Sequence, residues 1–224
     1  MKKPAVDYRN LRLGDPQYSH LKLLWGWVGY FLLFFLTERY IPPERCHVMW
    51  CTLDDKIPFC EGFAIFYVGW YGLVAGSLVY FLLYDIPAFC NLQTYLIITQ
   101  ILGMSACILY PSRQDLRPET FPRENILTAV MGFIYRIDTN TGVFPSMHVA
   151  YSVAVASVWL RRKTSPLWVR LALTTFCFGV CLSVVFVKQH SVLDILGAIP
   201  VCLAAEWFVY GKGFRCNRED GMIK

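Results

Sequence analysis

Long apolar runs restrict most strongly what this chain can fold into. A helix that crosses about 30 Å of hydrocarbon needs roughly 20 apolar residues. Five runs approach or reach that length, at about 21–36, 63–84, 92–110, 167–187 and 191–210. A sixth, shorter run at 147–160 ends cleanly at Arg161, Arg162 and Lys163, so we include it as a span. The sequence therefore predicts an all-α integral membrane bundle of six transmembrane helices with short loops.

Composition agrees with a membrane environment. The 224 residues are 56% hydrophobic, their mean hydropathy is +0.42 and only 17% are charged, whereas soluble domains contain roughly a quarter charged residues. The flanks of the apolar runs account for the net charge of +5, so no nucleic-acid partner is indicated. The nine cysteines lack paired CxxC spacing. This spacing indicates neither a zinc site nor a disulfide framework. We expect no metal and no cofactor in this protein.

Six spans leave room for one membrane-embedded domain that covers residues 1–224. We expect a cytoplasmic leader at 1–20, a core at 63–210 and a cytoplasmic tail at 211–224. The leader is too long and too mixed for a signal peptide, and no small-residue cleavage site follows the first run, so that run should be retained.

Lys and Arg concentrate in the leader, around residues 161–163 and in the tail, and such flanks tend to stay in the cytoplasm. The opposite face also carries basic residues, against the rule, and they need another reason to be there. They are Arg113, Arg117, Arg123, Arg136 and Lys188.

Three polar stretches should emerge together on that outer face. "YPSRQDLRPETFPRE" follows the third span, "GVFPSMHVAYS" begins the fourth, and "VKQHSVLDILGA" joins the fifth to the sixth. Their residues include the two histidines His148 and His190, the carboxylate Asp194, several arginines, Lys188 and Ser146. The span order therefore predicts one site built from all three.

Each stretch suits the binding or the chemistry of a phosphate. His190 and Asp194 are four residues apart and share a face if a helix begins by residue 190, so the carboxylate can orient the imidazole as a nucleophile. Ser146 is a candidate N-cap, and a helix start binds phosphate through free N–H groups. Arg117 precedes Pro118 in an extended loop, and its planar fork fits phosphate oxygens.

Simpler interpretations exist for the separate residues. A histidine such as His20 or His47 is commonly an interfacial anchor, and Asp194 can be a helix-start carboxylate. Arg113, Arg123 and Arg136 can be loop charges or lipid-headgroup contacts. The ordered combination of Arg-Pro, Pro-Ser-x-His and His-x-x-x-Asp on one face favours a catalytic site.

These residues resemble the type 2 phosphatidic acid phosphatase superfamily of lipid phosphatases and phosphotransferases. The pattern of that family is a lysine followed after six residues by Arg-Pro, then Pro-Ser-Gly-His, then Ser-Arg with His and Asp downstream. The resemblance covers roughly residues 63–210. The matching positions in this chain are Arg117-Pro118, Pro145-Ser146-Met147-His148, Ser183, His190 and Asp194.

The chain departs from the family pattern at three positions. Tyr110 replaces the lysine, Met147 the glycine and Val184 the arginine. We expect Lys188 and Arg113 to supply the missing positive charges. The modified layout is similar to the branch that contains sphingomyelin synthases and inositol phosphorylceramide synthases. We expect three further residues to line the site, namely Asp138, Asn140 and Tyr110.

The resemblance implies a metal-independent lipid-phosphate phosphatase that acts on a phosphomonoester or diphosphate. His190 would form a phosphohistidine, Asp194 would orient it, and His148 would protonate the leaving alkoxide. The expected phosphate contacts are Arg117, Ser146, Met147, Lys188 and Arg113. The partners would be the bilayer and a membrane lipid with a phosphate headgroup, and the site would face outward from a multi-pass protein, in our expectation of a bacterial cell membrane.

Three alternatives remain open at this point. The first is a phosphotransferase that moves a phospho-headgroup between lipids. The second is a non-catalytic lipid-binding protein, which would not need both histidines. The third is a small transporter with a proton relay, although a relay would lie at mid-membrane and these charges cluster at one interface.

Overall fold

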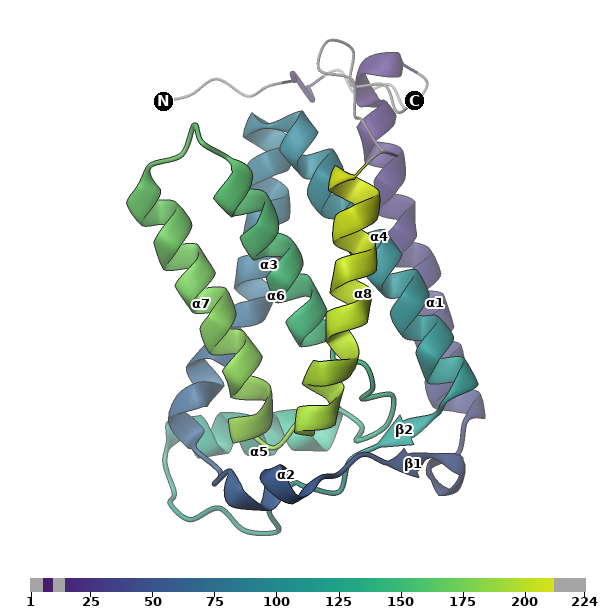
Figure 1. The fold of residues 1–224 in the computed structure, drawn as a ribbon, viewed down its shortest axis with the longest axis vertical. Coiled ribbons are helices and arrows are strands. Elements are labelled where there is room, and N and C mark those ends of the chain that lie inside the picture. The colour runs from purple at the N-terminus through teal and green to yellow at the C-terminus, as the bar shows by residue number, and fades with distance from the viewer. Residues whose placement is uncertain (1–5, 10–14, 212–224) are drawn as a thin grey trace.

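Five helices are long and apolar enough to cross a membrane, which identifies a multi-pass membrane protein. The structure is a computed structural model that describes residues 6–9 and 15–211. The five segments run side by side along the long axis (Figure 1). They are Pro16–Tyr40, Glu61–Tyr84, Ile86–Leu109, Leu167–Phe186 and Val192–Tyr210.

The first segment combines a short 3-10 helix, η1, with α1, and the second begins with the 3-10 turn η3. The other three segments are single helices. The bounds are η1 (Pro16–Leu24), α1 (Trp25–Tyr40), η3 (Glu61–Phe63), α3 (Ala64–Tyr84), α4 (Ile86–Leu109), α7 (Leu167–Phe186) and α8 (Val192–Tyr210).

The expected sixth span is the helix α6 (Met147–Arg161), and the count of six spans is not confirmed. This helix has 15 residues, which at 1.5 Å per residue reach about 22 Å. It nevertheless runs along the bundle and packs against α3, α4, α7 and α8. Small buried side chains, including Ala150 and Ala154, allow the neighbouring helices to approach closely.

The two ends of the bundle differ in the length of the loops that connect the helices and in the charged residues that these loops carry. We call the end that holds the α6–α7 connection the basic end, because Arg161, Arg162 and Lys163 lie there. Arg162 pairs with Asp85 at 2.7 Å, and Asp85 also caps α4 by accepting a hydrogen bond from the amide of Ala88.

The opposite end, called the site end, carries two long connections, at 41–60 and 110–146. The prediction of short loops is therefore wrong there. The connections contain five short elements, of which the strands pair in parallel and α5 lies across the bundle (Figure 1). These are η2 (Pro43–Arg45), β1 (His47–Val48), α2 (Thr52–Lys56), β2 (Ser112–Arg113) and α5 (Ile126–Ile137).

The predicted leader and tail are described only in part. Residues 1–5, 10–14 and 212–224, which include nearly all of the tail, lie outside the described residues. In the leader, the Tyr8 hydroxyl lies 2.9 Å from Nε2 of His20 and donates to the Leu82 carbonyl at 3.0 Å. This part of the leader therefore packs against the basic end of α3.

Candidate active site

The turn between α7 and α8 places His190 beside Asp194. The side chain of His190 is 8% exposed and that of Asp194 is fully buried. Nδ1 of His190 lies 3.1 Å from Oδ2 of Asp194, and the same oxygen accepts a hydrogen bond from the amide of Ser191 at 3.0 Å. Because α8 begins at Val192, His190 precedes the helix. The pair meets across the N-terminal turn, whereas the sequence suggested a shared helix face.

The second histidine, His148, lies in the first turn of α6 and faces His190. The centroids of the two rings are 5.7 Å apart. Two aromatic rings of α3 hold the His148 ring, with centroid distances of 4.5 Å to Tyr67 and 4.2 Å to Trp70. Among the described residues, Nε2 of His148 has no hydrogen-bond partner. This atom is buried, and its capacity to form a hydrogen bond is unused.

Both histidines line a cavity of about 570 Å³. The polar part of its lining lies at the site end, where Asp138 and Gln189 also contribute. The rest of the cavity continues along α1 and α3 and is aromatic. Its rings belong to Trp27, Tyr30, Phe31, Phe34, Tyr67, Trp70, Tyr71 and Tyr151. A polar head with an aromatic extension suits a lipid.

Asp138 is the carboxylate that faces this cavity. Its Oδ2 accepts a hydrogen bond from Nε2 of Gln189 at 3.4 Å. Burial raises the pKa of the Asp138 carboxyl, although the positive charge of Arg117 opposes that shift. In the part of the chain that the structure describes, no arginine or lysine side chain lines the cavity.

Arg117 lies next to the cavity and does not line it. Its guanidinium binds Gln189 and the backbone of residues 135–139. Its Nε and Nη2 donate to Oε1 of Gln189 at 3.0 and 2.7 Å. Its Nη1 donates to the carbonyls of Tyr135 and Asp138, at 3.1 and 2.9 Å, and Nη2 also donates to the carbonyl of Thr139 at 2.8 Å. All five N–H donors of the guanidinium thus have protein acceptors.

The two cations expected to compensate for the family's missing charges also have protein partners. Nζ of Lys188 donates to the carbonyls of Asp54, at 2.7 Å, and of Ile57. Burial lowers the pKa of the Lys188 ammonium, and the nearby acidic residues of α2 oppose that shift. Arg113 lies 3.3 Å from the Asp115 carboxylate. Neither lines the cavity, so this arrangement does not place Lys188 or Arg113 in contact with a bound phosphate.

The other expected site residues divide into two groups. Met147 lines the cavity, and Ser146 is the fully buried N-cap of α6, next to it in the chain. In contrast, Asn140 and Tyr110 do not line the cavity. Asn140 donates to the carbonyl of Gln114 at 2.8 Å, and the ring of Tyr110 stacks on that of His47 with centroids 4.3 Å apart.

Sequence reasoning missed Gln189 and the aromatic wall of α3. Gln189 immediately precedes His190, and its amide group joins Arg117 to Asp138. The wall has a signal in the sequence, because Tyr67, Trp70 and Tyr71 in "FYVGWYG" have the i, i+3, i+4 spacing of one helix face.

Fold and site together define a class of helical membrane protein with a carboxylate-oriented histidine at the mouth of an aromatic cavity. The chain belongs to the PAP2 superfamily, whose family model matches residues 88–218, more than half of its length. Members of this superfamily are generally phosphatases or phosphotransferases that act on phosphorylated lipids. No curated protein and no solved structure matches the chain significantly.

Proposed function

We propose that the protein is a membrane phosphatase that hydrolyses a lipid phosphomonoester or diphosphate through a phosphohistidine. One observation carries this proposal. His190 contacts Asp194 through Nδ1, so its Nε2 remains for nucleophilic attack, and His148 faces it across a ring-centroid distance of 5.7 Å. A nucleophile, an orienting carboxylate and a facing acid are the groups that form and break bonds and move protons in a two-step phosphoryl transfer.

In the first step, Nε2 of His190 attacks phosphorus and the bond from phosphorus to the leaving oxygen breaks. His148 gives its proton to that oxygen, so that the lipid leaves as an alcohol or as a phosphate. In the second step, His148 takes a proton from water, and the resulting oxygen attacks the phosphohistidine. Inorganic phosphate leaves, and both histidines return to their starting states.

Backbone amides at the start of α6 are the groups that we assign to the phosphate oxygens. Met147 and His148 follow the N-cap Ser146 and both line the cavity, and the first amides of a helix have no intrahelical acceptor. We assign Arg117 a positioning role through Gln189. The described residues contain no group of three His, Cys, Asp or Glu that could hold a metal ion, so we expect turnover to survive EDTA.

The charge of the cavity favours a second candidate function. A phosphomonoester carries up to two negative charges, and the described lining offers it the Asp138 carboxylate and no lysine or arginine. A phosphodiester carries one negative charge and is repelled less. The second candidate is therefore a phosphotransferase that moves a phospho-headgroup from a phosphodiester lipid, through His190, to a lipid alcohol.

One assay separates these functions. Detergent-purified protein is supplied with phosphatidate, a polyprenyl diphosphate or a zwitterionic phosphodiester lipid, the last with a diacylglycerol or ceramide acceptor and all with EDTA. Release of inorganic phosphate supports the phosphatase, and a new phospholipid supports the transferase. If none of these lipids reacts in wild type, or if His190→Ala reacts equally, the catalytic proposal is wrong.

We further propose that the site end faces outward from a bacterial cell membrane, because the opposite end carries the basic cluster. An impermeant thiol reagent applied to intact cells tests the orientation in a variant without native cysteines. It should label a cysteine at the exposed position Glu119 and not one at the exposed position Thr164. The reverse labelling would place the site in the cytoplasm.

A further inference from the structure

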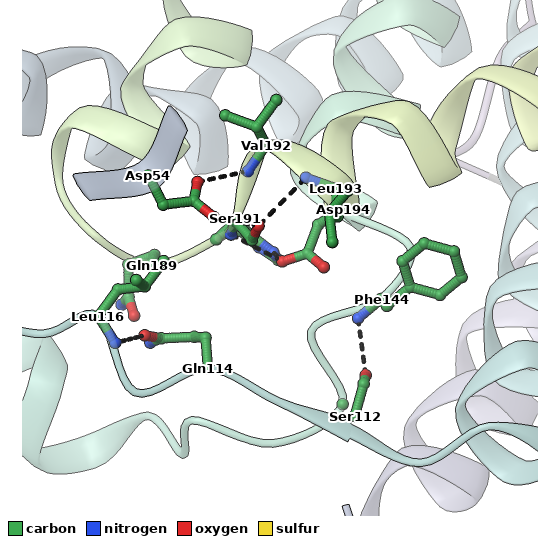
Figure 2. A network of polar contacts seen from close by, with 12 residues as sticks. Asp54, Ser112, Gln114, Leu116, Phe144, Gln189, Ser191, Val192, Leu193 and Asp194 are labelled. Atoms are coloured by element: carbon green, nitrogen blue, oxygen red, sulfur yellow. Dashed lines mark hydrogen bonds and ion pairs between the residues drawn. The ribbon is translucent and has the colours of Figure 1, made fainter. Parts of the chain in front are cut away.

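The α1–α3 connection brings a buried carboxylate to the start of α8 (Figure 2). This carboxylate is Asp54 of α2, and its residue is 2% exposed. Oδ2 of Asp54 accepts a hydrogen bond from the Ser191 hydroxyl at 2.6 Å, and Oδ1 accepts one from the Val192 amide at 2.8 Å. Asp54 precedes the residues that match the family model. It is therefore a contribution of this chain from outside the shared core.

Ser191 connects Asp54 to the histidine. Its hydroxyl donates to Asp54 and accepts from the Leu193 amide at 3.2 Å, while its own amide donates to Oδ2 of Asp194 at 3.0 Å. That oxygen of Asp194 is the one that faces Nδ1 of His190. A change in the position of Ser191 therefore moves the carboxylate that orients the imidazole.

The turn before His190 is fixed to the same connection from its other side. Lys188 has a φ of 52°, in the left-handed region that non-glycine residues adopt uncommonly. Its ammonium donates to the carbonyls of Asp54 and Ile57, and the Cys60 amide donates to the carbonyl of Phe186 at 2.9 Å. The α1–α3 connection thus stabilises the uncommon backbone conformation of Lys188 in the turn before His190.

Capping explains only part of what this carboxylate does. Within α2, Oδ2 of Asp54 accepts a hydrogen bond from the Cys51 amide at 2.8 Å and completes a capping box, but α8 does not need Asp54 as a cap. Ser191 already caps α8 through the Leu193 amide, and Asp194 completes a capping box through the Ser191 amide. Burying a second carboxylate beside that of Asp194 has an electrostatic cost. What Asp54 adds is a fixed position and orientation for Ser191, the residue between the two members of the histidine–carboxylate pair.

We propose that Asp54 is a positioning residue for His190 and acts through Ser191 and the first turn of α8. The inference rests on the proposed function, because it assumes that His190 attacks phosphorus. A small displacement of a nucleophile lowers the rate of the chemical step while ground-state binding is retained. The effect should therefore fall on kcat and on the binding of a transition-state mimic, and KM should change little.

The test compares Asp54→Asn with a matched control on the same helix. Asp55 neighbours Asp54 but is exposed, and its carboxylate accepts a hydrogen bond from Nε1 of Trp50 at 3.0 Å. Among the described residues it makes no hydrogen bond to Ser191 or Val192. Both substitutions remove one negative charge from α2. Asp54→Asn should lower kcat by about 10- to 100-fold and raise the vanadate inhibition constant in parallel, with KM within about twofold of wild type. Asp55→Asn should leave all three values within about twofold.

A double variant tests the path through Ser191. Asp54→Asn and Ser191→Ala remove the two partners of one hydrogen bond, so the kcat loss of the double variant should not exceed the larger single loss. Multiplied losses would overturn the inference, as would an Asp54→Asn variant that matches Asp55→Asn or changes KM alone. If Asp54→Asn does not fold, Ser191→Ala alone decides, and an unchanged kcat overturns the inference.

The two proposals fail in different ways. A wild-type protein that is active but insensitive to vanadate, or whose His190→Ala variant is fully active, overturns the proposed function and this inference together. A different result overturns this inference alone. In that case wild-type turnover requires His190 and is inhibited by vanadate, but the kcat of Asp54→Asn equals that of Asp55→Asn.

Discussion

His190 and Asp194 meet through one carboxylate oxygen, which lies 3.1 Å from Nδ1 of the histidine and also accepts the amide hydrogen of Ser191. A carboxylate at Nδ1 favours the tautomer that carries its proton there and its lone pair on Nε2. The backbone contact fixes the carboxylate in turn. The geometry therefore specifies which ring nitrogen acts as the nucleophile in the proposed reaction.

Asp194→Asn tests whether the carboxylate orients the His190 imidazole, because asparagine has nearly the same shape as aspartate. The amide can present its NH2 group to Nδ1, which would favour the opposite tautomer and block Nε2 as a nucleophile. We expect kcat to fall by about 10²- to 10⁴-fold, as for orienting carboxylates in hydrolytic triads, while KM changes little. Steady-state kinetics on purified protein measure both values, and a loss below about fivefold would contradict the orienting role.

His148→Ala should reveal the role of a proton donor through the leaving group. An alkoxide leaving from a lipid phosphate needs a proton, whereas nitrophenolate leaves as a stable anion. We expect a loss of about 10²- to 10⁴-fold on the lipid and a much smaller loss on nitrophenyl phosphate, if that substrate is accepted. Equal losses on both substrates would mean that His148 binds phosphate and does not donate a proton.

Asp138→Asn should make stability depend less on pH. Burial raises the pKa of the Asp138 carboxyl above its ordinary value of 3.8, so the folded protein holds this proton to higher pH than the unfolded chain does. Wild-type stability should therefore decrease as pH rises from about the ordinary value through the raised one. Thermal unfolding measured between pH 4 and 8 tests this. The unfolding temperature of Asp138→Asn should increase relative to that of wild type as pH rises. A difference in unfolding temperature that stays constant with pH would contradict this.

Gly103 makes room for Met147, which stands where the resembled family has glycine. A Cβ atom at position 103 would lie 2.6 Å from Sδ of Met147. Because a thioether side chain adapts easily, we expect Gly103→Ala to lower the free energy of unfolding by only about 1 kcal/mol, at the low end for overpacking. The displaced side chain should enter the cavity and raise KM. Gly103→Ala with Met147→Ala should restore KM, and an unrestored KM would contradict this explanation.

The parts of the fold that could be predicted are those that depend on local sequence. Apolar runs located the five long helices, because spanning a bilayer requires length and hydrophobicity that a sequence displays directly. The span order placed the motifs containing Arg117, His148 and His190 at one end of the bundle, where the structure also has them.

The remaining features depend on contacts between distant segments. The sequence shows that Arg117 can bind an anion, but not that Gln189 and three carbonyls occupy its donors. It gives no sign that Lys188 turns toward α2 or that Asp54 reaches Ser191, 137 residues further along the chain. Helix α5 was also missed, although it is amphipathic, because only longer apolar runs were read as helices.

Direct detection of a phosphohistidine is the most decisive measurement. Protein mixed with a lipid labelled at the phosphorus is quenched in alkali, which preserves phosphohistidine, then digested and examined by mass spectrometry. We predict label on the peptide that contains His190, no label in His190→Ala, and loss of the label when the quench is acidic. Label on another residue, or unlabelled wild-type protein under conditions of full turnover, would contradict it.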